Sequence, residues 1–213
     1  MEKFALTIAR GFGSGGKQVA VKVAKALGIE CYENRILTMA AQYSGMGEEK
    51  FLDEKLSGTY FINRLMKMPI ARNPLPVVSR FTSDPKLFDI QSHIIRELAK
   101  AESCVLVGKC ADYVLRDYDR VVSVYIEAPR DYCVKHLMER MPEITEDQAH
   151  DMISKTDRYR ADYYKYYTGG QSWNNVINYD LTINTGRTGE DAAVDLILYY
   201  LKEKFGVEPQ GKE

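Results

Sequence analysis

Residues 4–27 read FALTIARGFGSGGKQVAVKVAKAL. An apolar run typical of a buried strand is followed by a turn dense in glycine and then by an amphipathic helical pattern. Glycines at four of six positions leave the backbone free to curl, so that several N–H groups can face one concave site; these are Gly11, Gly13, Gly15 and Gly16. Lys17 adds a positive charge at the start of a helix whose N-terminal amides already favour anions. The stretch predicts a strand, a phosphate-binding loop and a helix, in a protein that handles a nucleoside triphosphate.

The loop fits two motifs that predict different chemistry. Gly11, Gly16 and Lys17 fit the G-x-x-x-x-G-K part of the Walker A pattern, with Gln18 where Ser or Thr would offer a hydroxyl to Mg²⁺. The glycines also fit the G-x-G-x-x-G of a dinucleotide-binding unit, with Glu33 about 20 residues further on, where a ribose-binding carboxylate would stand. We favour the phosphate loop, because a transferring phosphoryl group needs a cation and a pyrophosphate held by backbone amides does not. A glycine turn with an exposed lysine is the third alternative.

Length and composition limit the function classes. The 213 residues suit one domain with an inserted segment. A net charge of -1 gives no overall basic field, so we expect neither nucleic acid nor a membrane surface as a partner. The four cysteines show neither a C-x-x-C pair nor zinc-site spacing, so we assign no metal ligands and expect reduced, mostly buried thiols. The apolar run from Phe4 to Ala9 is too short for a signal peptide or a membrane span, which favours a cytoplasmic protein.

Apolar and amphipathic segments alternate along the rest of the chain. The strands are predicted at residues 4–9, 29–32, 103–107, 120–126 and 181–184. The helices are predicted at residues 19–27, 36–43, 86–101, 129–140, 146–167 and 190–205. Strands separated by helices favour a three-layer α/β fold of the P-loop type, with a central parallel sheet, helices on both faces and ligands at the carboxyl ends of the strands.

Three segments of the single domain 1–213 depart from this alternation. Residues 46–85 carry four prolines and scattered arginines, and we interpret them as a mobile, acceptor-binding insertion. Residues 145–175 form a polar and aromatic segment, which we interpret as a lid, and residues 206–213 are expected to be disordered. The lid holds the densest aromatic cluster of the chain, for which packing on the core or a subunit contact is favoured over stacking on a base. Whether the protein forms a homo-oligomer therefore stays an open question.

Two groups beyond the loop carry further candidate residues. Lys109 and Asp112 follow a predicted core strand, where the lysine could bind an acceptor phosphate and the aspartate a hydroxyl or a hydrated cation. In the segment Asp157-Arg158-Tyr159-Arg160, two arginines two positions apart cannot share a helix face, so both would reach one ligand only near a bend or a helix end. The alternatives are an ordinary turn with a surface lysine and a solvated helix with charge pairs one turn apart.

Together these segments resemble the cytidylate kinase-like branch of the nucleoside monophosphate kinases, over residues 1–45 and 87–200. The matching segments are Ala9-Arg10-Gly11, Gly13-Ser14-Gly15-Gly16-Lys17, Leu27-Gly28, Tyr32-Glu33, Val107-Gly108-Lys109, Ala111-Asp112-Tyr113, Asp157-Arg158 with Arg160, Tyr179-Asp180-Leu181 and Asn184-Thr185. The resemblance implies a P-loop kinase that uses ATP and Mg²⁺ and phosphorylates a small-molecule acceptor, for which a pyrimidine nucleoside monophosphate is preferred.

The resemblance also implies roles for single residues. The catalytic residues would be Lys17, Arg158 and Arg160. The nucleotide would be bound by Gly11, Gly13, Ser14, Gly15, Gly16, Lys17 and Gln18. The acceptor would be bound by Glu33, Arg35, Lys109, Asp112 and Asp157. True cytidylate kinases have G-R-D at the strand end, whereas this chain has Gly108-Lys109-Cys110. The chain therefore lacks the guanidinium group and the aspartate of that motif, and the identity of the acceptor stays open.

Two other functions stay open. A nucleotide-binding regulatory module with a decayed acceptor site would account for Lys109 and Cys110, although the retained loop lysine and the two arginines count against it. An NAD-binding oxidoreductase would place Glu33 on a ribose and would leave Lys17 without a task.

Overall fold

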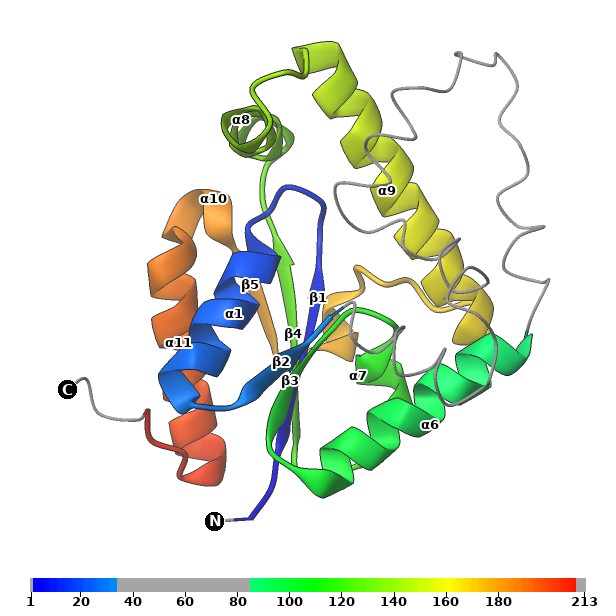
Figure 1. Ribbon diagram of the computed structural model, residues 1–213, viewed down its shortest axis with the longest axis vertical. Coiled ribbons are helices and arrows are strands. Elements are labelled where there is room, and N and C mark those ends of the chain that lie inside the picture. Colours follow the sequence, from blue (N-terminus) through cyan, green and yellow to red (C-terminus); the bar gives the residue numbers. More distant parts are fainter. Residues whose placement is uncertain (1, 34–84, 210–213) are drawn as a thin grey trace.

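The computed structural model describes residues 2–33 and 85–209 (Figure 1). The predicted helix at 36–43, Arg35 and residues 46–84 of the expected insertion lie outside the described residues. In the described part, parallel strands form one sheet in the order β2-β3-β1-β4-β5. The strands are β1 (Ala5–Arg10), β2 (Glu30–Tyr32), β3 (Cys104–Val107), β4 (Val121–Glu127) and β5 (Leu181–Asn184). Each lies within one residue of its predicted bounds.

Helices cover both faces of the sheet, which confirms the three-layer α/β architecture (Figure 1). One face is covered by α1 (Gly16–Leu27) and α11 (Glu190–Phe205), the other by α6 (Pro85–Ala101) and α7 (Ala111–Val114). Beyond the carboxyl edge of the sheet lie α8 (Arg130–Arg140) and α9 (Glu146–Tyr167). The short elements α7, α10 (Thr185–Thr188) and the 3₁₀ turn η1 (Val176–Asn178) escaped prediction, because one turn shows no periodicity.

The core explains why the strands read as continuous apolar runs. In β3, Val105 packs toward α1 and α11, whereas Leu106 packs toward α6 and α7. A central parallel strand is buried on both faces, so successive residues are apolar. The four cysteines are free thiols, three of them buried, as expected.

Local signals set the ends of the helices next to the site. Helix α1 starts after Gly15 and ends at Gly28, and both glycines have left-handed backbones, with φ of 77° and 65°. Helix α9 begins with a capping box, in which Gln148 N donates to Thr145 Oγ1 (3.2 Å) and Thr145 N donates to Gln148 Oε1 (2.8 Å). The sequence predicted the glycine stop and the threonine cap.

The chain stays packed after α11 ends. Gly206 closes the helix with a φ of 67°, and Val207 is 3% exposed among the core residues of α1 and α11. The expected disordered tail therefore does not begin at Gly206, because burial of the valine holds the chain against the sheet. Among the helices that the structure describes, none combines the length and apolar character needed to cross a membrane.

Candidate functional site

The sheet topology brings two turns together. Strands β1 and β3 are neighbours, and Gly108 N donates to Ile8 O (3.0 Å). The loop that follows β1 and the turn that follows β3 therefore start side by side at the carboxyl edge. This is the edge where ligands bind in parallel α/β sheets.

The Ser14 side chain shapes the glycine loop from within. Its hydroxyl lies 2.9 Å from Gly11 O and 3.2 Å from Ile126 O, both carbonyl acceptors, and the residue is fully buried. The Ser14 carbonyl accepts from Thr185 Oγ1 (2.5 Å). The Ser14 hydroxyl therefore holds the loop against β4, and the expected place of Ser14 among the nucleotide-binding residues stays a prediction.

Two glycines of the loop are required by its path. Gly13 and Gly15 have φ of 84° and 77°, a region that other residues adopt only with strain. A Cβ atom at Gly13 would lie 2.8 Å from Cys133 O, and one at Gly15 would lie 2.6 Å from Glu190 Oε1. The loop therefore fits only without side chains at these positions.

The loop offers donors that fit an anion. Within residues 2–33 and 85–209, the backbone N–H groups of Gly13, Gly15 and Lys17 have no hydrogen-bond acceptor. They stand at the N-terminus of α1, where the aligned peptide dipoles favour negative charge. Lys17 adds its ammonium group, on a side chain that is 53% exposed. These donors suit the phosphates of a nucleotide.

Asp157 in α9 contacts the loop backbone. Its Oδ1 accepts from Phe12 N (2.8 Å) and lies 3.2 Å from Arg160 Nη1. Burial raises the pKa of Asp157, although the Arg160 charge and the Phe12 N–H pull in the opposite direction. Asp157 thus joins α9 to the glycine loop, and the place near the acceptor nucleoside that the resemblance implies stays a prediction.

Helix α8 also braces the loop. His136 Nδ1 donates to Gly13 O (2.9 Å), a contact that no pattern in the sequence predicts. The Gln18 amide, in the orientation that satisfies its neighbours, donates to Gly15 O (3.1 Å) and accepts from the Arg140 guanidinium. Gln18 therefore supports the loop through side-chain contacts and brings a cation of α8 to the start of α1.

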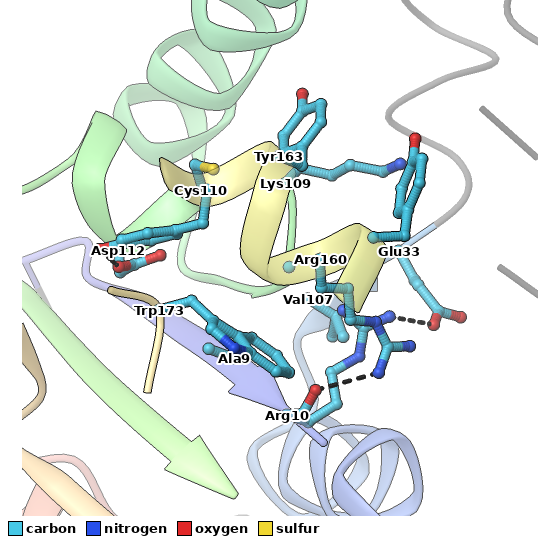
Figure 2. Close-up of a pocket in the computed structure, with 13 residues that line it drawn as sticks. Ala9, Arg10, Glu33, Val107, Lys109, Cys110, Asp112, Arg160, Tyr163 and Trp173 are labelled. Atoms are coloured by element: carbon cyan, nitrogen blue, oxygen red, sulfur yellow. Dashed lines mark hydrogen bonds and ion pairs between the residues drawn. The ribbon is translucent and has the colours of Figure 1, made fainter. Parts of the chain in front are cut away.

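A pocket opens between this edge of the sheet and α9 (Figure 2). Its walls come from the ends of β1 and β3, the turn after β3, α9 and the segment that follows α9. The lining residues are Ala9, Arg10, Glu33, Val107, Gly108, Lys109, Cys110, Asp112, Tyr159, Arg160, Tyr163, Tyr164 and Trp173. The structure thus brings together Glu33, Lys109, Asp112 and Arg160 of the predicted site. It adds Arg10, for which no role was predicted, and Trp173 from the aromatic cluster.

The two predicted lid arginines point to different places. Arg160 lines the pocket, donates to Arg10 O (3.1 Å) and pairs with Asp157. Arg158 is exposed and does not line the pocket. Helix α9 runs unbroken through both, so their spacing turns them to different sides, and no bend brings them to one ligand in this conformation.

The end of the pocket next to the loop is charged. Glu33 Oε1 lies 3.1 Å from Arg10 Nη2, and Glu33 Oε2 lies 2.6 Å from Lys17 Nζ. Burial by itself would raise the pKa of Glu33, but the charges of Arg10 and Lys17 outweigh it and hold this pKa below its ordinary value. Glu33 is therefore an ionised carboxylate between two cations.

The other end of the pocket is aromatic and holds one carboxyl group, from Asp112 (Figure 2). Tyr164 OH donates to Asp112 Oδ2 (2.7 Å), which ties α9 to α7. Tyr163 and Tyr164 pack on Cys110. The aromatic residues of α9 thus pack on the core, as the sequence favours, and they give the pocket flat apolar walls.

The turn after β3 has an unusual backbone. Gly108, Lys109 and Cys110 have φ of 72°, 58° and 55°, three consecutive left-handed residues. For a residue with a side chain this conformation costs about 1–2 kcal/mol, and such strain gathers at functional sites. A Cβ atom at Gly108 would collide with the Arg10 guanidinium, so this glycine gives Arg10 its place in the pocket.

Replacing Asp112 by asparagine should change how stability depends on pH. Burial raises the pKa of Asp112 from 3.8 to about 6. The native protein therefore binds more protons than the unfolded chain between about pH 4 and pH 6, so wild-type stability falls as pH rises through that window. Asparagine does not titrate in this pH window. Relative to Asp112→Asn, the wild-type protein should therefore lose on the order of 2 kcal/mol of unfolding free energy across the window. Urea unfolding of both proteins from pH 4 to pH 7.5 measures this, and parallel curves would contradict it.

The model of the cytidylate kinase-like family matches residues 5–187. Among solved structures, an uncharacterized protein from Eubacterium ventriosum is 26% identical, with a TM-score of 0.69 over 94% of this chain and 99% of that one. No match was found among curated proteins.

More distant structures show the fold alone. A sugar kinase from Janibacter sp. is 12% identical, with a TM-score of 0.52 over 98% of this chain and 100% of that one. A shikimate kinase from Bacteroides thetaiotaomicron is 11% identical, with a TM-score of 0.50 over 93% and 98%. The likeness confirms the P-loop kinase fold. Because the family model spans most of the chain, the protein belongs to the cytidylate kinase-like family.

Proposed function

We propose that the protein transfers the γ-phosphoryl group of ATP to the phosphate of a small acceptor, with a pyrimidine nucleoside monophosphate as the preferred class. Family and fold support phosphoryl transfer in general. The observation that carries the finer proposal is the polarity of the pocket. Arg10 and Arg160 line its end next to the loop, and Tyr163 and Trp173 line the rest. Guanidinium groups at the reacting end suit an anionic attacking group, and aromatic walls suit a flat base.

Catalysis in this proposal consists of positioning and charge stabilisation. The loop N–H groups and Lys17 hold the donor phosphates, while Arg160 faces the group in transfer from the lid side. Arg158 would take part only after a movement of α9, and its catalytic role stays a prediction. The packing of Tyr163 and Tyr164 on Cys110 holds the lid helix over the pocket and limits the access of water.

Mg²⁺ fits this site without protein ligands of its own. The described residues contain no group of three or more His, Cys, Asp or Glu side chains that could hold a metal ion. Gln18 replaces the usual hydroxyl residue, and its amide contacts Gly15 and Arg140. Mg²⁺ bound through phosphates and water would supply neutralisation of the donor charge. The cytoplasmic location and the absence of a nucleic-acid partner stay predictions.

A second candidate is an acceptor that reacts through a hydroxyl group, such as a sugar or a sugar acid. The observation that favours it is Glu33, a carboxylate 2.6 Å from Lys17 Nζ, where a general base for a hydroxyl would stand. Fold neighbours include a sugar kinase and a gluconokinase. The pairing of Glu33 with Lys17 and Arg10 counts against the NAD alternative, in which Glu33 would bind a ribose.

An acceptor screen tests the proposal. ADP formation from ATP and Mg²⁺ is measured with CMP, dCMP, UMP, gluconate and shikimate as separate acceptors, and with no acceptor as the blank. We expect ADP formation above the blank with at least one nucleoside monophosphate. Turnover with a hydroxyl acceptor alone would support the second candidate. Nucleotide binding without turnover on any acceptor would support the regulatory module.

A further inference from the structure

Glu33 lies between two cations that come from different elements. Arg10 is the last residue of β1, and Lys17 is in the first turn of α1. We propose that Arg10 and Lys17 form a phosphate-binding site that joins the loop to the pocket, and that Glu33 occupies this site as an internal anion, which the phosphate of a ligand displaces. In this arrangement Arg10 binds the phosphate of the ligand. Glu33 does not bind the substrate but competes with its phosphate for Arg10 and Lys17.

The charges around Glu33 support an anion site. Among the ion pairs of the described residues at this end of the pocket, Arg10, Lys17 and Arg160 are the cations and Glu33 and Asp157 the carboxylates. One of these, Asp157, is already engaged by Arg160 and by the Phe12 N–H. Burial and then the Arg10 charge lower the pKa of Arg160, which indicates that positive charge is crowded here. Without Glu33 the end of the pocket would carry a clear excess of positive charge.

Arg10 is held in place as a binding group would be. Its side chain is 11% exposed, and its carbonyl accepts from Arg160 Nη1. Its guanidinium passes over Gly108, at a point where a Cβ atom would block it. In the part of the chain that the structure describes, the ion-pair partner of this guanidinium is Glu33. A guanidinium so placed can bind a phosphate through two parallel hydrogen bonds.

The bond between Glu33 and Lys17 is the weak point of this arrangement. Lys17 is 53% exposed, and ion pairs in water-exposed positions contribute about 0–1 kcal/mol. A phosphate carries more negative charge than one carboxylate and can also accept from the loop N–H groups that have no acceptor among the described residues. A phosphate should therefore displace the Glu33 carboxylate from Lys17, and it should then also take the place of this carboxylate at Arg10.

Inorganic pyrophosphate is the probe, because its binding requires neither a base nor turnover. Binding to the full chain is measured by calorimetry without divalent metal, at about 50 mM salt, where charge effects are weakly screened. We expect Glu33→Gln to bind pyrophosphate about tenfold more tightly than wild type. Glu30→Gln, the same change at the exposed first residue of β2, serves as the matched control and should stay within about twofold.

Arg10→Gln in the Glu33→Gln background assigns the site. The gain should disappear in this double variant, because the second cation is gone. The proposal would be overturned if Glu33→Gln bound pyrophosphate no more tightly than wild type. If the gain in affinity remained in the double variant with Arg10→Gln, the proposed binding role of Arg10 would be overturned. Circular dichroism checks the fold, and Glu33→Ala replaces Glu33→Gln if the latter does not fold, with the same gain expected.

The inference rests on the proposed function only in taking the displaced anion to be a substrate phosphate. A gain in pyrophosphate binding together with an empty acceptor screen would support the site and reject the proposed reaction. Turnover of a nucleoside monophosphate without the gain would support the reaction and reject the site.

Discussion

Replacing Lys17 by alanine should lower the rate of phosphoryl transfer by at least about 10³-fold and leave the fold intact. The lysine is half exposed, and in the described part of the chain its contact is the ion pair with Glu33. Removing it costs little folding free energy, because alanine is a good helix former. The transferring group, in contrast, loses a cation that no neighbouring side chain of α1 can replace.

Single-turnover kinetics with the acceptor found in the screen measure this loss, and thermal unfolding measures the fold. Lys25→Ala is the matched control, since Lys25 is exposed two turns further along the same helix. Its rate should remain close to that of wild type. Normal turnover by Lys17→Ala with any accepted acceptor would reject the assignment of the phosphate loop.

Replacing Arg160 by glutamine should lower the rate by about 10²- to 10³-fold. Arg160 is the lid arginine that lines the pocket, and it holds Arg10 O and Asp157 in place. Its loss removes positive charge where charge develops during transfer and also leaves the Asp157 carboxylate with a weaker partner. Because Asp157 accepts from Phe12 N, part of the effect should come through the loop.

The comparison that isolates this effect uses two exposed residues of α9. Lys155→Ala removes a cation that pairs with Asp151, one turn back on the helix surface, and should change the rate by less than about threefold. Arg158→Ala should lose far less than Arg160→Gln, because Arg158 lies outside the pocket. Equal losses for Arg158→Ala and Arg160→Gln would show that the lid rearranges before transfer. A rate near wild type for Arg160→Gln would contradict its place at the transferring group.

Much of the fold followed from the sequence because its signals are local. Burial on both faces makes β3 a continuous apolar run, and the helix stop at Gly28 needs only a residue that accepts a left-handed backbone. The tail after α11 was harder to predict. Val207 is held by packing against distant residues, and that contact leaves no pattern in the neighbouring sequence.

The candidate site was predicted in part. Glu33, Lys109, Asp112 and Arg160 meet in one pocket, since all but the last follow strands that end at the same edge. The contacts of the Ser14 hydroxyl with the carbonyls of Gly11 and Ile126 could not be predicted, because the sequence of a loop does not show which way a hydroxyl faces. A signal for Arg10 was available, namely a charged residue at the end of an otherwise apolar strand, directly before the glycines.

By itself, the sequence determined that this protein has a phosphate loop between a buried strand and a helix, within an alternating α/β chain. These features depend on residues a few positions apart, whose backbone preferences and periodicity act locally. Only the tertiary structure decided the partners: Glu33 with Arg10, Asp112 with Tyr164, and Asp157 with Phe12, which are 23, 52 and 145 positions apart. Such contacts depend on strand order and on the angle at which α9 crosses the sheet edge, and local sequence encodes neither.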